Sequence, residues 1–325
     1  MRQGLFIVIG LAACYGHTAA QTLDHPLGRS APAMRSQRLS DQRTLGLSGL
    51  DVDEHGVYWS VPEHRRELLQ LDRHGVVLKT LGNPRRIVGV PKHFELESIA
   101  ALGGQRFVLG TELKSTRDAD TLFFAHIKDD TLVVTNSVKL SYAAWAMQAT
   151  SNHGIEGLCA TKNHLVAVSE SVHKTPGHRL APLWLMDRDA AVQRHFSVQL
   201  TTSQGKLSAL HCAPEAVSGQ LNVWAIERHF GVGRILSFAI PIYEALSSAP
   251  VEIPTTVEVD LVHNNQPIPN FEGLAREDGT FIFLNDNDSA GRNGDNWMIS
   301  VQCADAEAEV SVYCKNNHRP GGGGH

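Results

Sequence analysis

The sequence predicts an all-β protein in which one short pattern of strands is repeated several times. Three observations support this. A phrase built on Glu-Gly-Leu returns along the chain, each copy continues into a hairpin of β-forming residues, and no long stretch has the apolar spacing of an amphipathic helix. Units of about 40–60 residues with three or four short strands are typical of a β-propeller. We therefore expect a single β-propeller of five or six blades.

The phrase is clearest at residues 270–288, NFEGLAREDGTFIFLNDND, and at residues 152–171, NHGIEGLCATKNHLVAVSES. A looser copy begins at His93, and two more, beginning at Leu45 and Lys206, carry serine in place of the glutamate. Alignment of the five copies places one polar residue of each, at intervals of 49, 59, 52 and 64 residues, at a shared first position: Ser48, Glu97, Glu156, Ser208 and Glu272.

Each copy continues with a turn and a second strand that ends on an acidic residue. This acid lies 14 or 15 residues after the first position in four copies and 19 residues after it in the remaining one. The first strand of each propeller blade lines the central channel, so the first-position residues are expected to face that channel. The strand-ending acids are expected near its mouth: Glu63, Glu112, Glu170, Glu227 and Asp286.

The N-terminal residues have the layout of an export signal. Residues 1–20 read MRQGLFIVIGLAACYGHTAA, with one arginine, an apolar run and small residues before a cleavage point after Ala20. A second interpretation treats Leu11-Ala12-Ala13-Cys14 as a lipoprotein signal that ends before a lipid-anchored Cys14. We expect an exported protein, periplasmic or secreted, with no transmembrane span.

The rest of the chain divides into three parts. Residues 21–44 form an N-terminal segment from which a ring-closing strand is expected, residues 45–315 form the propeller, and residues 316–325 form a flexible Gly-rich tail. The number of blades, five or six, is left open, because residues 76–92 and 240–268 have room for a further unit.

Charge and cysteine content indicate which partners to exclude and which disulfides to expect. Without residues 1–20 the chain has 28 basic and 34 acidic residues, a balance that argues against nucleic acid and anionic membranes as partners. Four cysteines remain, and an even number in an oxidising compartment predicts bridges. The expected pairs are Cys303–Cys314, which flank an acidic turn, and Cys159–Cys212, which occupy nearly equivalent first-strand positions.

Acidic residues that converge on one axis repel each other unless a cation or a proton lies between them. Calcium suits such a site, because it takes six to eight oxygen ligands in flexible geometry. The alternative is a solvated channel whose acids bond to the backbone or to arginine. The expected metal ligands are Glu97, Glu156, Glu272, Glu227 and Asp286.

Cationic residues follow the mouth acids along the chain. Arg228, Lys114 and Arg292 are the candidates for holding an anionic small molecule, since Arg forks onto phosphate oxygens and Lys supplies a point charge. The alternative is that these cations pair with the acids in a ring of salt bridges. Both interpretations are left open at this point.

Several phrases resemble one known family. The stretches SGL, IEGLCA, WAIERHF and NFEGLAREDGTFIFLNDND are similar to those of the phytase-like β-propellers, the "esterase-like activity of phytase" proteins. The resemblance runs over most of the chain after residue 45. It implies calcium-supported phosphoester hydrolysis. Two first positions are serine, and His229 stands where this family commonly has arginine.

The expected function is therefore a calcium-dependent phosphoester hydrolase that acts on an anionic small molecule. No catalytic residue is assigned, since the chain lacks a Gly-x-Ser-x-Gly elbow, a His-Glu-x-x-His motif and a P-loop. The alternative is a non-catalytic propeller that binds a partner protein or a glycan, because propellers host unrelated functions.

Overall fold

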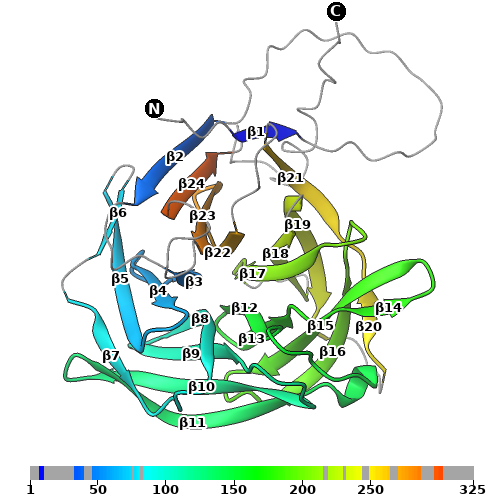
Figure 1. Ribbon diagram of the computed structural model, residues 1–325, viewed down its shortest axis with the longest axis horizontal. Coiled ribbons are helices and arrows are strands. Elements are labelled where there is room, and N and C mark those ends of the chain that lie inside the picture. The colour runs from blue at the N-terminus through cyan, green and yellow to red at the C-terminus, as the bar shows by residue number, and fades with distance from the viewer. Residues whose placement is uncertain are drawn as a thin grey trace, which may run out of the picture.

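The described residues form an all-β fold, as the sequence predicts. They include one short 3-10 helix, Ala143–Trp145, and no α-helix. The sheets lie around a central axis, as in a β-propeller (Figure 1). Among the described residues no helix is long and apolar enough to cross a membrane. The computed structural model describes residues 7–10, 33–39, 46–74, 77–80, 83–214, 219–229, 232–243, 249–263, 270–286 and 296–302.

One strand from each copy of the repeated phrase lies next to the axis. Each of these inner strands packs against the next, and the last packs against the first, so that their contacts close into a ring (Figure 1). The phrase recognised in the sequence is thus the inner strand of a sheet. In chain order the inner strands are β3 (Leu47–Val52), β8 (Glu95–Gly103), β12 (Ile155–Ala160), β17 (Lys206–Cys212) and β22 (Asn270–Glu277).

From every inner strand the chain moves outwards through antiparallel pairs. Four of the mouth acids, Glu63, Glu112, Glu170 and Asp286, lie at or just beyond the ends of the second strands, level with the starts of the inner strands, whereas Glu227 lies two residues before the end of its strand. The second strands are β4 (Tyr58–Pro62), β9 (Arg106–Glu112), β13 (His164–Ser169), β18 (Gln220–His229) and β23 (Thr280–Asp286). The third strands are β5 (Glu67–His74), β10 (Ala119–Lys128), β15 (His178–Asp187), β19 (Val232–Pro241) and β24 (Asn296–Gln302).

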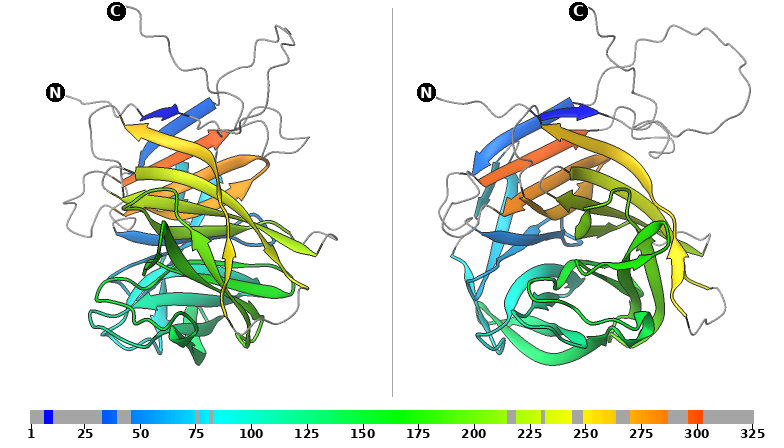
Figure 2. Two further views of the ribbon diagram at one scale, coloured as in Figure 1. Left: turned by 90° about the vertical axis from the view of Figure 1, so that its right-hand side faces the viewer. Right: turned by 45° about the vertical axis from the view of Figure 1, so that its right-hand side comes forward.

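A fourth strand completes each sheet on the outside. One of these strands, β2, comes from before the first copy, yet it pairs antiparallel with β24, with Met34 opposite Val301 (Figure 2). A strand from before the first copy and the last described strand therefore share a sheet. The fourth strands are β6 (Val77–Thr80), β11 (Thr131–Ser141), β16 (Val192–Gln199), β21 (Thr256–His263) and β2 (Ala33–Leu39).

Four short strands extend these sheets. β7 (Arg85–Val88) runs parallel to β11 and also pairs with β5, and β20 (Val251–Ile253) runs parallel to β16. β14 (His173–Thr175) forms a hairpin with β15, and β1 (Ile7–Gly10), within the predicted export signal, pairs with β21. The strands found between residues 76 and 92, and between 240 and 268, thus belong to sheets of the recognised copies.

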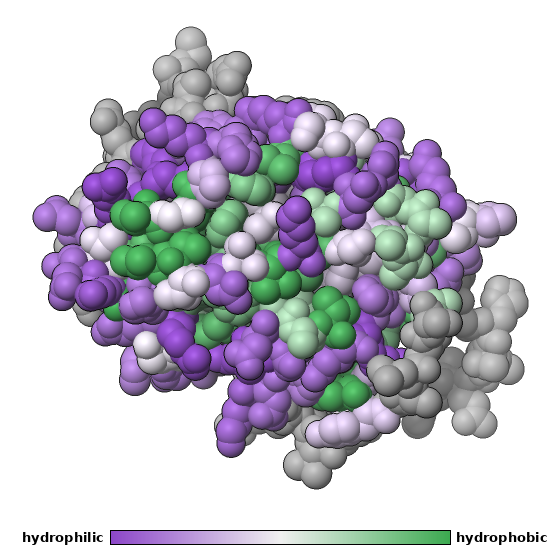
Figure 3. Space-filling model, turned by 90° about the horizontal axis from the view of Figure 1, so that it is seen from below, coloured by the Kyte–Doolittle hydropathy of each residue, from purple (hydrophilic) through white to green (hydrophobic). Residues whose placement is uncertain are grey.

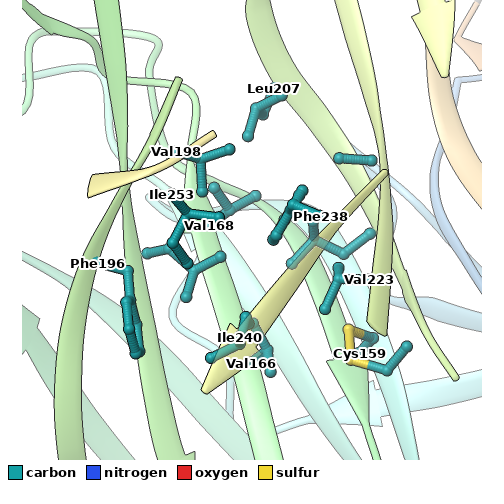
Figure 4. Packing of buried hydrophobic residues seen from close by; sticks show 14 of the residues in the cluster. Cys159, Val166, Val168, Phe196, Val198, Leu207, Val223, Phe238, Ile240 and Ile253 are labelled. Carbon is teal, nitrogen blue, oxygen red and sulfur yellow. A yellow bond between two sulfur atoms is a disulfide. The ribbon is translucent and has the colours of Figure 1, made fainter. Parts of the chain in front are cut away.

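The hydrophobic core lies between neighbouring sheets. In the largest cluster shown in Figure 4, Val166 and Phe196 of one sheet face Val223 and Phe238 of the next. Three similar clusters fill other gaps between adjacent sheets. Apolar residues alternate between the two faces of each strand, so each sheet contributes to the cluster on either side.

A disulfide joins Cys159 of β12 to Cys212 of β17, with a Cα–Cα distance of 5.5 Å. This confirms the predicted pairing and cross-links two neighbouring inner strands. Cys14, Cys303 and Cys314 lie outside the described residues.

The outer surface mixes hydrophobic and hydrophilic residues, as the face seen from below shows (Figure 3). Among the described residues the exposed large hydrophobic side chains are Val88, Val192 and Tyr243. They belong to β7, to β16 and to the segment after β19, so they come from separate parts of the chain.

Candidate functional site

A β-bulge interrupts each inner strand at the repeated first position. In β8 the extra residue is Glu97, which lies between the pairs Leu96–Thr111 and Ser98–Gly110. A bulge re-aims the side chain of the extra residue relative to its neighbours. The other extra residues are Glu156, Ser208 and Glu272, and in β3 the bulge falls on Gly49, next to Ser48.

A small residue follows the first position in every copy, and the structure explains why. A Cβ on Gly49 would lie 2.9 Å from the Cα of Ser98, and one on Gly273 would lie 2.8 Å from the Cβ of Leu50. Neighbouring inner strands therefore approach too closely for larger side chains. The residues in this second position are Gly49, Ser98, Gly157, Ala209 and Gly273.

Three carboxylates meet at one side of the channel mouth. Glu95, Glu97 and Glu112 each offer an oxygen, and these oxygens lie within 4.8 Å of one another. Glu97 is 5 % exposed, and among the described residues neither its Oε1 nor the buried Oε2 of Glu95 has a hydrogen-bond partner. A second group shares Glu95 with the first: one ligand atom each of Glu63, His64 and Glu95 also lie within 4.8 Å of one another.

The charges of this cluster oppose each other. Burial raises the pKa of Glu97 well above its ordinary value, and the carboxylates of Glu156 and Glu112 raise it further. Burial and then the contact with Glu95 raise the pKa of Glu112 to about 9. Burial, with Asp286 nearby, raises the pKa of Glu63 to about 8. The buried carboxylates therefore retain protons at neutral pH unless a cation replaces those protons.

Glu272 lies on the other side of the mouth and is well bonded. It accepts hydrogen bonds from Ser48 Oγ at 3.0 Å, Arg228 Nη2 at 2.7 Å and Asn270 Nδ2 at 2.7 Å. Burial raises its pKa to about 7, although Arg228 acts in the opposite direction. The serine of the first copy thus serves as a hydrogen-bond donor to the glutamate of the last.

Arg228 connects two of these carboxylates. Besides Glu272, it pairs with Glu170 Oε1 at 3.2 Å. Burial acts to lower the pKa of Arg228, but Glu272, Glu170 and then Glu156 raise it above its ordinary value. Its charge is accordingly compensated by the protein's own acids.

Two further predicted ligands belong to the same group. Burial raises the pKa of Glu156 well above its ordinary value, followed by the effects of Glu170 and Glu112. Asp286 is buried, receives a 3.4 Å hydrogen bond from Asn270 Nδ2, and raises the pKa of Glu272. The structure thus brings Glu97, Glu156, Glu272 and Asp286 into one electrostatic cluster.

The structure does not bring Glu227 into this cluster. Its carboxylate accepts hydrogen bonds from the backbone N–H groups of Thr201 and Thr202 at 3.0–3.1 Å and from both threonine hydroxyls. Its oxygens therefore organise the turn before β17. The ladder register gives the reason: Glu227 lies opposite Leu207, one residue before Ser208, so that Arg228 takes the position that Glu112 has opposite Glu95.

Among the predicted anion-binding cations, Lys114 pairs with Glu95 Oε1 at 2.6 Å and Arg228 pairs with Glu170 and Glu272. Both are salt-bridged to mouth acids, as the alternative interpretation expects. Arg292 lies outside the described residues.

The sequence interpretation missed Glu95. It lies directly opposite Glu112 in the β8–β9 ladder. Once Glu112 is placed at the mouth, this register brings Glu95 there as well, but the register depends on the bulge at Glu97, which the sequence does not mark.

A family model with the description "Phytase-like: Esterase-like activity of phytase" matches residues 32–289. The chain belongs to this family. The match includes all five inner strands of this phytase-like chain and the acids of its channel mouth. No curated protein sequence is similar enough to count as a match.

Solved structures resemble the phytase-like chain at low sequence identity. The PQQ-bound aldose sugar dehydrogenase of Streptomyces coelicolor is 12% identical, with a TM-score of 0.43, over 84% of this chain and 100% of its own. A streptogramin B lyase is 8% identical, with a TM-score of 0.40, over 83% and 98%. An α-L-arabinofuranosidase of Clostridium thermocellum is 8% identical, with a TM-score of 0.44, over 75% and 83%. With each TM-score below 0.5, no activity is transferred from these proteins.

Proposed function

We propose that this phytase-like protein is a five-bladed propeller that binds calcium at the mouth of its channel and hydrolyses a phosphoester of an anionic small molecule. The observation that carries the proposal is the group of Glu95, Glu97 and Glu112, in which a buried oxygen of Glu97 has no hydrogen-bond partner in the part of the chain that the structure describes. The closed contacts of the five inner strands support the blade count.

Calcium fits this donor set. Calcium–oxygen distances are about 2.3–2.6 Å, so two ligands of one ion lie no more than roughly 5 Å apart. The oxygens of Glu95, Glu97 and Glu112 lie within 4.8 Å of one another. All three are hard carboxylate donors, and a dication would relieve the repulsion that raises the pKa values of Glu97 and Glu112.

The remaining carboxylates have supporting roles in this proposal. Bound calcium would polarise a phosphoryl oxygen and lower the pKa of a bound water. Arg228 holds Glu272 and Glu170 in place. Glu272, whose pKa of about 7 lies near the working pH, is suited to exchange a proton with a substrate or a water.

The first experiment is titration calorimetry with calcium, followed by a screen of phosphomonoesters with and without a chelator. We expect wild-type protein to bind calcium, and Glu97→Gln to weaken that binding by tenfold or more, since it removes a charged ligand. Glu252→Gln is the matched control, because Glu252 is exposed on β20 and lies outside the cluster. If Glu97→Gln leaves calcium affinity unchanged, the proposed ligand set is wrong.

A non-catalytic binding propeller is the second candidate. It is favoured by the hydroxyls of the two first-position serines, which are used in structural bonds: Ser48 donates to Glu272, and Ser208 donates to the carbonyl oxygen of Phe271 at 2.7 Å. Neither is arranged as a nucleophile beside a histidine base. If calcium binds but no phosphoester is hydrolysed, the metal is structural and this candidate replaces the hydrolase.

Export belongs to the same proposal. The bridge between Cys159 and Cys212 supports an oxidising compartment, as does the signal-like layout of residues 1–20. Fractionation of cells that express the full chain, with Cys14→Ser as a comparison, separates soluble export from lipid anchoring. Membrane association lost in Cys14→Ser would favour the anchored form.

A further inference from the structure

A small cavity adjoins the carboxylate cluster. Its volume is about 160 Å³, enough for several waters. The cavity lies where the β12–β16 sheet meets the start of β17, and Glu170 connects it through Arg228 to Glu272. Its polar lining includes Thr150, His153, Glu170, Ser171, Arg179 and Lys206.

The charges that line this cavity do not balance. Arg179 and Lys206 supply two positive charges, and Glu170 supplies one negative charge. Lys206 Nζ lies 3.4 Å from Glu170 Oε2, so Glu170 already has a counter-charge. Arg179 Nη2 donates only to the carbonyl oxygens of Gln204 and Gly205, at 3.4 and 3.1 Å, and within the described part of the chain it has no ion pair with a carboxylate. The charged side chains that line the cavity thus carry one net positive charge.

His153 holds Lys206 against the cavity wall. The Lys206 ammonium can only donate, so His153 Nε2, 2.7 Å from Nζ, accepts and Nδ1 carries the hydrogen, close to the carbonyl oxygen of Ser151 at 2.9 Å and Thr150 Oγ1 at 2.7 Å. Arg117 fixes this loop in turn, through a 3.0 Å bond from its Nη2 to the carbonyl oxygen of His153. The ammonium group is therefore positioned before any ligand arrives.

We infer that this cavity binds a compact oxyanion, the phosphoryl or carboxylate group of a small molecule, between Arg179 and Lys206. The guanidinium group supplies planar paired donors and the ammonium group a point charge, which together suit a small anion with several oxygens. The volume admits one such group with a few waters. Arg228 and Lys114, the cations predicted from the sequence, are paired with acids, and Lys206 is paired with Glu170, so Arg179 is the cation of this cavity whose charge has no carboxylate partner among the described residues.

This inference rests on the proposed function in one respect: the anion would lie next to the proposed calcium site, so that one substrate reaches both. The two sites use different residues, because Arg179 and Lys206 are absent from the carboxylate group of Glu95, Glu97 and Glu112. They can therefore be tested separately.

The test is calorimetry with inorganic phosphate and, separately, with acetate, on full-length protein dialysed free of divalent metal. We expect wild-type protein to bind one of these anions, and Arg179→Gln to weaken the binding by tenfold or more, since hydrogen bonds to charged groups are the strong ones. Lys206→Met is expected to act in the same direction. Arg179→Lys, which retains the charge, should recover part of the loss.

Arg86→Gln is the matched control, because Arg86 is an exposed arginine on β7 and is distant in sequence from the residues that line the cavity. Circular dichroism and thermal unfolding verify that each variant is folded. A preference for phosphate identifies a phosphoryl ligand, and a preference for acetate identifies a carboxylate. The inference is overturned if neither anion binds to wild-type protein, or if folded Arg179→Gln binds as tightly as wild type. Calcium titration of the same variants distinguishes this failure from failure of the proposed function.

Discussion

Glu227 illustrates how local partners decide the role of a repeated residue. It is the acid near the end of its second strand, as Glu112 is in its copy, but the ladder register differs. Glu112 lies opposite Glu95, two residues before Glu97, whereas Glu227 lies opposite Leu207, one residue before Ser208, and is enclosed by the turn at Thr201 and Thr202. A Cβ added to Gly205 would lie 2.0 Å from Glu227 Oε1, so the turn closes tightly over the carboxylate. A fully hydrogen-bonded carboxylate stabilises a turn and has few lone pairs left for a metal.

We therefore predict that Glu227→Gln destabilises the protein by about 1–3 kcal/mol, because an amide cannot accept all of these bonds at both positions. Urea unfolding measures the change in the free energy of unfolding. Glu252→Gln serves as the control, since Glu252 is exposed and accepts a single 3.2 Å bond from Gln199. A Glu227→Gln variant as stable as wild type would contradict this role.

The buried carboxyl group of Asp51, which is not one of the mouth acids, is expected to make the stability of the protein depend on pH. Burial raises its pKa to about 7, against hydrogen bonds that act to lower it, including one from the backbone N–H of Ala101 at 2.6 Å. The folded state thus retains a proton that the unfolded chain loses near pH 4. This contribution to stability is complete below about pH 3.8 and is lost as the pH rises to about 7.

Asp51→Asn removes this titration while keeping an oxygen that accepts from Ala101. Relative to wild type, the variant should gain stability as pH rises from 4 to 7, on the order of 1 kcal/mol for each tenfold difference in proton affinity between the folded and unfolded states. Urea unfolding at pH 4, 5, 6 and 7 measures the difference between the two proteins. A constant difference across this range would show that Asp51 is ionised throughout.

At the scale of single strands, close packing around the axis dictates the Glu-Gly-Leu phrase. The bulge places the polar residue, and the small residue after it lets the next inner strand approach. For Gly157, an added Cβ would lie 2.7 Å from a methyl of Val168 and 2.8 Å from Leu210 Cγ. Glycine is needed here for space, since Gly157 is part of an ordinary strand.

Gly157→Ala should accordingly destabilise the fold by about 1–3 kcal/mol through overpacking. Truncation of the neighbour in Leu210→Ala makes room, so the double variant should lose less stability than the sum of the two single changes. Thermal and urea unfolding of all four proteins complete the cycle. Strict additivity would mean that Gly157 does not contact Leu210 in this way.

At the scale of the whole molecule, sheets far apart in sequence must be held in a ring. The bridge between Cys159 and Cys212 joins two inner strands across a sequence separation of 53 residues. A loop of this length corresponds to about 4 kcal/mol in the chain-entropy model of disulfide stabilisation.

We expect the double variant Cys159→Ser, Cys212→Ser to lose about 2–4 kcal/mol of stability. Calcium affinity should be kept, because the proposed ligands Glu95, Glu97 and Glu112 lie on β8 and β9 and not on the two bridged strands. Chemical unfolding and calorimetry on the same samples test both parts. Loss of calcium binding from a folded double variant would show that the bridge positions the site.

The sequence by itself determined the all-β class, the five inner strands and the pairing of Cys159 with Cys212. Strand periodicity and turn residues are local patterns that a sequence displays directly. Comparison of the repeated copies then shows which positions are equivalent. It also indicated that Glu97, Glu156, Glu272 and Asp286 converge, because equivalent positions of a closed ring face one axis.

Only the tertiary structure decided which charges remain to act on a ligand. It removed Glu227 from the cluster, added Glu95 through the ladder register, and paired Arg228 and Lys114 with acids. It also showed Arg179 at a cavity without a carboxylate partner among the described residues. Pairing of charges depends on distances between side chains from different sheets, and no spacing along the chain contains those distances.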